Sequence, residues 1–389
     1  KATAAWPAGF ILILLIVLAA GCMKTIEETE IQVLRVPDNG IQPVVERDDH
    51  GTLHMIYFNG EPAAGNVFYR KKESGQDNFS EPVRVNSQSE SVIAIGTVRG
   101  AHMSVTGDGR VHVAWMGSRE AEPKGPGDAA PMLYTRLNET GNAFEEQRNI
   151  MQAAIGLDGG GTVAAGNDDM VYVVWHANPE KTGEEDRQVW MAKSADGGDT
   201  FDQEVAISNP ETGVCGCCGI KATVDHAGEH AVIYRAATKL TGRDMYLLRS
   251  SGSGMSFSEQ MLEPWKINAC PMSTSSAFSE HDKFSVAWET NGQVSFASTK
   301  DATQQVDSLT RAPGDSRSRK HPAVAHNNRE ETILVWTEKM GWERGGTLHW
   351  QVFDVNLQPT SKSGRSDDVP VWSRPAVVTN ENGDFTIFY

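Results

Sequence analysis

The chain has 389 residues, of which 51 are acidic and 35 are Lys or Arg, so its formal net charge is −16. This balance argues against binding to DNA, RNA or anionic lipid, because these polyanions require a basic surface on their protein partner. Hydrophobic residues make up 39% and charged residues 22% of the chain, a composition typical of a soluble globular protein with a sizeable core.

The N-terminus has the features of an export signal. Residues 10–20 form an unbroken apolar run, which has the length of a signal-peptide core and is too short to span a bilayer. Cys22 follows in the sequence Leu-Ala-Ala-Gly-Cys, which resembles a bacterial lipobox with a lipidated cysteine. We expect a lipoprotein-type signal peptide over residues 1–21 and a tether over 22–29. The protein would then be a cell-envelope lipoprotein of the outer membrane or periplasm, contacting a membrane only through its lipid anchor; a cleaved signal and secretion are the alternative.

One pattern recurs seven times through the rest of the chain. Each copy is a polar turn followed by an alternating apolar run that ends in an aromatic residue. These closing aromatics are 58, 60, 59, 54, 48 and 53 residues apart. They are Tyr57, Trp115, Trp175, Tyr234, Trp288, Trp336 and Tyr389. A strand-built repeat of about 40–60 residues is typical of a β-propeller, so we predict an all-β fold in a single domain over residues 30–389.

Each repeat contains the four strands of a propeller blade, named A to D in chain order. Strand A and a tight turn rich in Asn, Asp and Gly precede the aromatic run, as at residues 101–109 and 322–328. These residue types tolerate the positive φ of tight turns. Strands C and D follow the aromatic run, as at 189–192 and 204–207. Four antiparallel strands per repeat make one blade.

The number of blades is six or seven. Seven A–B hairpins are present, but no C or D strand follows the last one, which ends at Tyr389. Residues 26–36 have the pattern of a strand and could complete this last blade. That pairing would close the ring and remove its open edges, so the sequence favours seven blades.

The C–D turn of the third repeat carries the motif S-x-D-x-G-x-T-F, formed by Ser194, Asp196, Gly198, Thr200 and Phe201. The Ser and Asp oxygens suit backbone N–H groups of the hairpin, the Gly permits an unusual φ, and the ring packs beneath. Residues 250–257 hold a degraded copy that lacks the Asp. This Asp-box indicates a structural role.

The Asp-box and the repeats resemble the sialidase superfamily, and in particular its exported bacterial members with BNR or Asp-box repeats, over roughly residues 30–389. The resemblance implies a sialidase-like propeller with its active site on the face opposite the Asp-box. Sialidases bind the substrate carboxylate through three arginines and use a Tyr–Glu nucleophile pair with an Asp acid/base. Their first arginine lies in a motif like Arg35-Val-Pro, but Arg35 lies about six residues before the first A strand, which departs from the family pattern.

Strand order places the D–A and B–C loops on one face and the A–B and C–D turns on the other. The first face gathers cations, whose guanidinium forks suit a carboxylate or sulfate. We expect a pocket there for an anionic glycan or glycoconjugate. The candidate ligand-binding residues are Arg99, Arg235, Arg374, Lys320, His321, Trp342 and Arg344, and the same face holds Lys221, Arg243 and Lys266. Alternatively, these cations pair with the acidic residues Glu289, Glu338, Asp158 and Asp244 and only fix the loops.

The residues leave open whether this pocket is catalytic. Glu289 and Asp158 are candidate catalytic carboxylates, and Tyr246 is a candidate nucleophile. A glycosidase needs two such groups about 5–10 Å apart. The first hypothesis is an exo-acting glycoside hydrolase of the exo-α-sialidase type. The alternative is a non-catalytic surface propeller that binds glycan or protein. We expect a monomer in either case.

Apart from Cys22, the chain has four cysteines, Cys215, Cys217, Cys218 and Cys270. An even number in an exported protein is typical of disulfides. We predict a Cys218–Cys270 disulfide between neighbouring blades, with Cys215–Cys217 as a second link. The alternative is a Cu or Zn site built from these thiolates; no other cofactor is expected.

Overall fold

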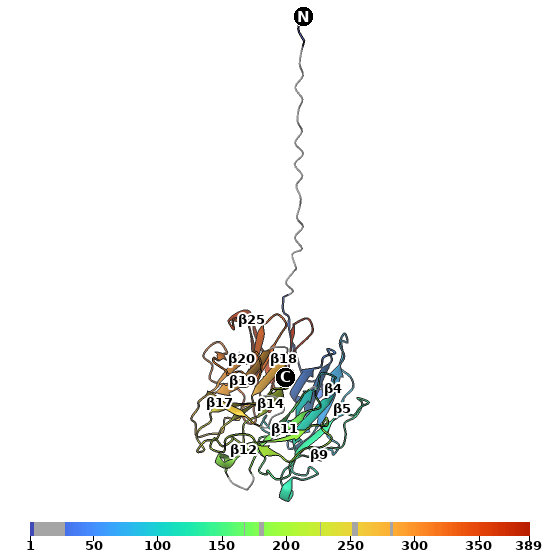
Figure 1. Ribbon diagram of the computed structural model, residues 1–389, viewed down its shortest axis with the longest axis vertical. Coiled ribbons are helices and arrows are strands. Elements are labelled where there is room, and N and C mark those ends of the chain that lie inside the picture. Colours follow the sequence, from blue (N-terminus) through green and yellow to red (C-terminus); the bar gives the residue numbers. More distant parts are fainter. Residues whose placement is uncertain (4–27, 167, 179–182, 226, 251–255, 281–282) are drawn as a thin grey trace.

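The computed structural model describes residues 1–3, 28–166, 168–178, 183–225, 227–250, 256–280 and 283–389. Within these ranges the chain forms 27 strands and three 3₁₀ helices, and the strands make seven sheets arranged around one axis (Figure 1). The predicted export signal with Cys22 lies outside the described residues, as does most of the degraded Asp-box copy. Among the described residues, none belongs to a helix that is long and apolar enough to cross a membrane.

Six of the sheets are four-stranded and antiparallel, with their strands in chain order. Blade 1 has β2 (Ile41–Arg47), β3 (Leu53–Glu61), β4 (Ala64–Lys72) and β5 (Val83–Arg84). Blade 2 has β6 (His102–Val105), β7 (Val111–Met116), β8 (Met132–Arg136) and β9 (Arg148–Asn149). Blade 3 has β10 (Gly161–Ala165), β11 (Val171–Ala177), β12 (Gln188–Ser194) and β13 (Val205–Ala206).

The second half of the ring repeats this arrangement. Blade 4 has β14 (Lys221–Val224), β15 (His230–Arg235), β16 (Met245–Ser250) and β17 (Ser258–Glu263). Blade 5 has β18 (Ser276–Glu280), β19 (Lys283–Thr290), β20 (Gln293–Thr299) and β21 (Thr310–Arg311). Blade 6 has β22 (Arg319–His326), β23 (Thr332–Glu338), β24 (Gly346–Phe353) and β25 (Pro359–Val369). The 3₁₀ helices are η1 (Pro37–Asn39), η2 (Pro126–Asp128) and η3 (Glu184–Asp186).

Blade 7 is built from both ends of the chain. It contains β26 (Ala376–Thr379), β27 (Phe385–Phe388) and β1 (Ile31–Leu34). The expectation that residues 26–36 complete the last blade is confirmed for β1, and seven blades are correct. The blade has three strands, however, and β1 runs parallel to β27 rather than antiparallel. The seventh blade thereby joins the first and last parts of the fold.

The closing aromatics lie between blades because each blade buries both of its faces against its neighbours. Trp115 packs with Ile56 and Phe58 of blade 1, and Trp175 packs in the same way with Tyr134 of blade 2. The B strands are accordingly buried along almost their whole length. Seven such layers make the core a ring rather than a single centre.

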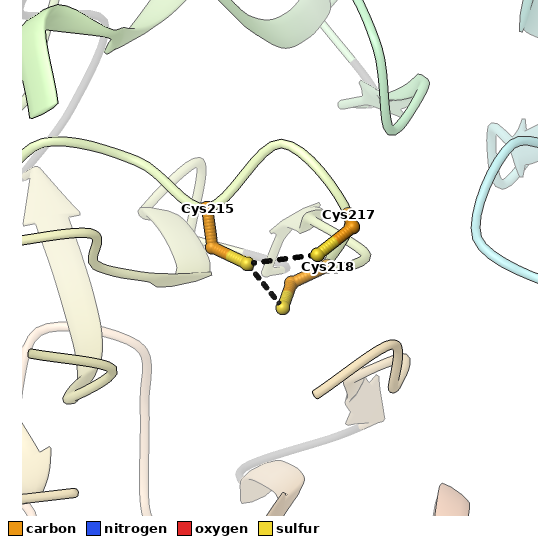
Figure 2. Close-up of side chains that lie close together, drawn as sticks. All are labelled: Cys215, Cys217 and Cys218. Carbon is orange, nitrogen blue, oxygen red and sulfur yellow. Dashed lines mark hydrogen bonds between the residues drawn. The ribbon is translucent and has the colours of Figure 1, made fainter. Parts of the chain in front are cut away.

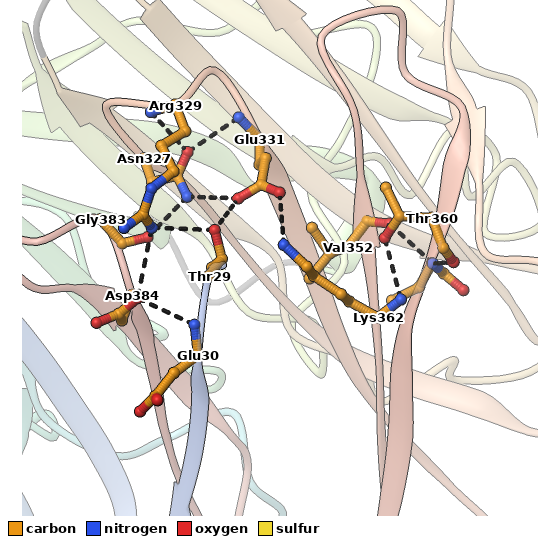
Figure 3. Close-up of polar contacts among 11 residues, drawn as sticks. Thr29, Glu30, Asn327, Arg329, Glu331, Val352, Thr360, Lys362, Gly383 and Asp384 are labelled. Carbon is orange, nitrogen blue, oxygen red and sulfur yellow. Dashed lines mark hydrogen bonds and ion pairs between the residues drawn. The ribbon is translucent and has the colours of Figure 1, made fainter. Parts of the chain in front are cut away.

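Polar contacts hold the start of β1 against blades 6 and 7 (Figure 3). The Thr29 hydroxyl donates to the Glu331 carboxylate, which also accepts from Lys362 at 3.1 Å. The Glu30 N–H donates to Asp384 Oδ1 at 3.0 Å, and Arg329 pairs with the same carboxylate at 3.4 Å. These bonds fix the chain entry just outside the apolar layer that Ile31 and Val33 join.

The Asp-box lies in the C–D turn of blade 3. Ser194 Oγ accepts the Gly198 N–H at 2.9 Å and donates to Asp196 Oδ1 at 2.7 Å. Asp196 in turn accepts the hydroxyl and the N–H of Thr200, and these bonds lower the pKa of Asp196. Phe201 packs edge-on against Tyr134 at 4.9 Å between ring centroids. All these contacts stabilise the turn and its neighbour blade.

Removing residues 1–36, which deletes β1, is expected to lower the free energy of unfolding by about 2–6 kcal/mol, because four residue pairs lose hydrogen bonds worth about 0.5–1.5 kcal/mol each. Removing residues 1–27 keeps β1 and is the control. Urea denaturation followed by tryptophan fluorescence measures the difference. Equal stability of the two truncated proteins would contradict the closing role of β1.

Candidate functional site

A cavity of about 900 Å³ runs along the propeller axis. Residues from the A strands of all seven blades line it. At one end it reaches the A–B turns, including Asp49, Asp168 and Asp225. At the other end it is lined by residues at or just before the starts of A strands, among them Lys221 and Arg374. Its volume lies in the range that holds small-molecule ligands.

The cavity thus extends toward the face of the A–B turns, whereas the sequence placed the pocket on the opposite, D–A and B–C face. Hydrogen bonds join loops on the D–A side of blade 1. The Gln42 side-chain amide donates to the carbonyls of Ala94 and Trp372 at 2.7 and 2.8 Å. The Gln42 N–H also donates to Ser373 Oγ at 3.3 Å. These bonds join the D–A loops on both sides of blade 1 next to the axis.

Cations gather at this end of the cavity. Arg374 comes from the start of blade 7, Lys221 from blade 4 and His102 from blade 2. Within the described residues, the Arg374 side chain makes one hydrogen bond, to the Ala101 carbonyl at 3.5 Å. Lys221 Nζ lies 3.9 Å from the Glu46 carboxylate. Glu46, His102, Lys221 and Arg374 thus all line the cavity, and Glu46 is near Lys221.

Arg374 and Lys221 are partly buried, and their loss of hydration dominates the electrostatics of this cluster. It lowers the pKa of Arg374 to about 10. It also lowers the pKa of Lys221, although Glu46 opposes the shift. Burial and the positive charges of Arg374 and Lys221 hold the pKa of His102 well below its usual value, so His102 is neutral at pH 7. An anion bound here would relieve the mutual repulsion of the cations.

Two of the predicted ligand-face arginines are paired with carboxylates instead. Arg99 donates to Asp158 Oδ1 at 2.6 Å and to the Asp158 carbonyl at 2.7 Å. Arg243 pairs with Glu184 at 2.9 Å. In these two places the loop-fixing alternative describes the structure.

Arg235 is 2% exposed and links blade 4 to blade 5. Its guanidinium donates to the carbonyls of Arg243 and Glu289 and lies over the Trp265 ring, 5.1 Å from its centroid. Buried backbone carbonyls need such donors. Arg235 therefore has partners that satisfy it without a ligand.

The remaining predicted ligand residues lie apart from the cavity or point elsewhere. Lys320 donates to the Pro271 carbonyl, and Arg344 is exposed and donates to the Lys339 carbonyl. His321 is buried, and burial together with Lys320 and Arg374 lowers its pKa to about 3.

Trp342, a predicted ligand-binding residue, contacts the ring of Trp372. The rings of Trp342 and Trp372 meet at 70°, with centroids 6.1 Å apart. Trp342 is 48% exposed, so this pair forms part of the surface of the D–A and B–C face.

The three catalytic candidates are not brought together. Asp158 is held by Arg99 between blades 2 and 3. Tyr246 lies within β16, stacked on Tyr234. Glu289 is 2% exposed at the end of β19, where burial raises its pKa and the Gly292 N–H donates to it. None of the three lines the cavity, and among the described residues no hydrogen bond or ring contact joins any two of them.

The cysteines form a compact cluster on the loop between β13 and β14 (Figure 2). The Cys215 sulfur lies 2.7 Å from that of Cys218 and 3.5 Å from that of Cys217. All three are buried, whereas Cys270 is exposed, and all four are free thiols. Cys270 groups with Cys217 and Glu184.

The structure joins neither of the predicted pairs, Cys218–Cys270 and Cys215–Cys217, by a disulfide bond. The Cys218 N–H reaches back to the Cys215 carbonyl at 3.4 Å, and this turn places the side chains of residues three apart on the same side. The two-residue gap between Cys215 and Cys218 was a sequence signal for this arrangement.

The thiols of the cluster differ in pKa. Burial opposes ionisation of Cys218, but hydrogen bonds from Cys215 and Cys217 and the charge of Arg235 lower its pKa well below the usual value. Hydrogen bonds to Cys217 and Cys218 raise the pKa of Cys215. One sulfur is thus favoured as a thiolate that accepts from two thiols.

No protein-family model and no curated protein matches the chain. Among solved structures, it is similar to an α-L-arabinanase of Penicillium chrysogenum complexed with arabinobiose, with 12% identity, a TM-score of 0.51, and coverage of 85% of this chain and 98% of that one. A Hadza microbial sialidase, Hz136, has 13% identity and a TM-score of 0.48 over 81% and 70% of the two chains. The polysaccharide lyase Uly1 has 11% identity and a TM-score of 0.46 over 82% and 78%. The predicted β-propeller fold is confirmed by the seven sheets.

Replacing Arg235 by Met is expected to lower the free energy of unfolding by about 3 kcal/mol or more, because two buried carbonyls lose a charged donor. The matched control is Arg344→Met on the exposed surface, where a change within about 0.5 kcal/mol is expected. Denaturant unfolding of both variants provides the measurement. A fully stable Arg235→Met protein would show that Arg235 has no such structural role.

Proposed function

We propose that the protein binds the anionic end of a glycan in its central cavity, where Arg374 and Lys221 hold a carboxylate or sulfate. The proposal rests on the position of Arg374 in the cavity and on its lack of strong hydrogen bonds among the described residues. This guanidinium lies at the inner end of a cavity of about 900 Å³, and its one hydrogen bond among the described residues is a 3.5 Å contact.

The energetics of Arg374 support a ligand. Withdrawing a cation from water costs several kcal/mol unless hydrogen bonds and an opposite charge compensate it. Arg99 and Arg243 each pair with a carboxylate, whereas Arg374 makes only its contact with the Ala101 carbonyl among the described residues. An apolar side chain would serve folding better at this position. A carboxylate or sulfate would supply the missing bidentate acceptor.

Acidic residues at the opposite end of the cavity would disfavour ligands that carry several negative charges. Its A–B turns carry Asp49, Asp168, Asp225 and Glu381, and the whole chain has a net charge of −16. Polyanions are repelled by such a rim, whereas a largely neutral sugar chain offers hydroxyls to these carboxylates. The arrangement therefore suits a glycan that ends in a single acidic sugar.

Two further observations support a sugar as the ligand class. The arabinanase that shares the fold was solved with arabinobiose. The sequence of residues 10–22 resembles an export signal, and we propose that it brings the protein to the cell envelope. Because none of Glu289, Asp158 and Tyr246 lines the cavity, we propose binding without hydrolysis.

The variant Arg374→Met tests the proposal. The parent is expected to bind methyl glucuronide or methyl sialoside and not methyl glucoside, as measured by isothermal titration calorimetry. Arg374→Met should weaken acid binding at least about tenfold, the loss of one charge-assisted hydrogen bond, without lowering the free energy of unfolding. Arg344→Met, on the exposed surface, should bind like the parent. Undiminished binding by Arg374→Met would refute the assignment.

The pH dependence of binding provides a second test. A glycan carboxylate stays ionised above about pH 6, so only the protein changes its charge. As the pH rises toward about 10, Lys221, whose pKa is lowered, and Arg374, with its pKa of about 10, lose their protons. The association constant should therefore fall steadily toward about pH 10. An affinity that is constant or rises over this range would contradict the roles of both cations.

A further inference from the structure

We propose that Cys215, Cys217 and Cys218 bind one copper(I) ion through three thiolates. This site is distinct from the proposed glycan site, since no cysteine lines the central cavity. The sulfur atoms of the three residues all lie within 4.8 Å of one another, and Figure 2 shows them directed toward a common point.

The loop that carries the sulfurs is held in place from three directions. The Cys215 N–H donates to the Arg235 carbonyl at 2.9 Å, and the Gly219 N–H donates to the Ser273 carbonyl at 3.0 Å. Between them, the Gly216 N–H donates to Glu184 Oε1 at 2.9 Å. Such supporting bonds keep ligand atoms near a binding geometry before the metal arrives.

The Cys215 sulfur lies closer to the other two sulfurs than it would around a bound ion, so a small outward rotation of the side chains would let all three reach one ion. A metal about 2.3 Å from each thiolate holds neighbouring sulfurs about 4 Å apart. The Cys215–Cys218 and Cys215–Cys217 distances are 2.7 and 3.5 Å, so the side chains need only small rotations. Each cysteine is 8% exposed or less, and the Met272 side chain packs against them, which excludes water from the site.

The donor set favours copper(I) over zinc. Thiolates select both ions, but structural zinc takes four ligands. The fourth cysteine, Cys270, groups with Cys217 and Glu184 and not with the other two sulfurs. An all-sulfur set of three fits copper(I), and the charge of Arg235 beside Cys218 offsets part of the negative charge of the complex.

Cys270 gives the ion a route into the site. It is exposed and lies next to the buried Cys217, so it can contact copper(I) before the three inner sulfurs do. Binding requires no change of oxidation state, because copper enters and stays as copper(I). The inner thiols release their protons as the three Cu–S bonds form.

Titration of the anaerobic, reduced full chain with copper(I), in competition with bicinchoninic acid, tests the proposal. One ion per chain is expected. The variants Cys215→Ser, Cys217→Ser and Cys218→Ser should each lower the affinity by roughly a hundredfold or more, while the matched control Cys270→Ser still binds one ion. X-ray absorption at the copper edge should show three Cu–S contacts. Circular dichroism and binding to methyl glucuronide, which should be unchanged, establish that each variant is folded.

Three results would overturn the copper site. The first is peptide mapping of the protein as isolated that finds Cys215–Cys218 and Cys217–Cys270 disulfides. The second is a folded Cys217→Ser protein that binds copper(I) as tightly as the parent. The third is a preference for zinc that depends on Cys270. None of these results bears on the glycan site, because that site contains no cysteine.

Discussion

Burial of both faces of every blade is the constraint on which this structure depends. Each blade covers its neighbours with residues such as Trp115 and Trp175. If the ring were left open, the last blade would expose one face and one edge. β1 removes that exposure by joining β27. Once the ring is closed, the A strands must surround one axis, and the residues that begin them must meet there. Arg374 and Lys221 converge for this reason although 153 residues separate them in the sequence.

The arginines near the axis have different partners and therefore different effects on stability. Arg235 ends a strand, and Arg99 and Arg243 lie in loops just before strands. Each binds a carboxylate or a carbonyl of a nearby loop and so contributes to the stability of the ring. Arg374 meets other cations and keeps a weak contact. The two situations have opposite energetic signs, because a buried charge stabilises a fold only when its partners compensate the lost hydration. A cation that costs stability inside a cavity is a stronger indication of a ligand than many cations on a surface.

The repeats predicted much of the fold but less of the site. Alternating apolar runs and Asn/Asp/Gly turns are local signals, so the seven hairpins and the completion of the last blade near residues 31–34 could be predicted. The parallel direction of β1 could not, because it depends on where the chain enters the ring. The repeat pattern could not predict which side chains pair. Arg99 donates to Asp158, 59 residues away, and Gln42 donates to carbonyls of two different loops. These contacts join loops on the D–A and B–C face, whereas the cavity reaches the A–B turns. The cysteine cluster could have been predicted, because the spacing of three residues between Cys215 and Cys218 indicates a turn that places both side chains on the same side.

The central claim is that an acidic sugar reaches Arg374 and Lys221 from the face of the A–B turns. A crystal structure of the protein soaked with methyl glucuronide tests this most directly. The account predicts the sugar inside the axial cavity, with its carboxylate within hydrogen-bond distance of the Arg374 guanidinium and near Lys221 Nζ, and with its ring toward the acidic turns. A carboxylate bound on the D–A and B–C face, beside Trp342 and Arg344, with only water at Arg374, would contradict it.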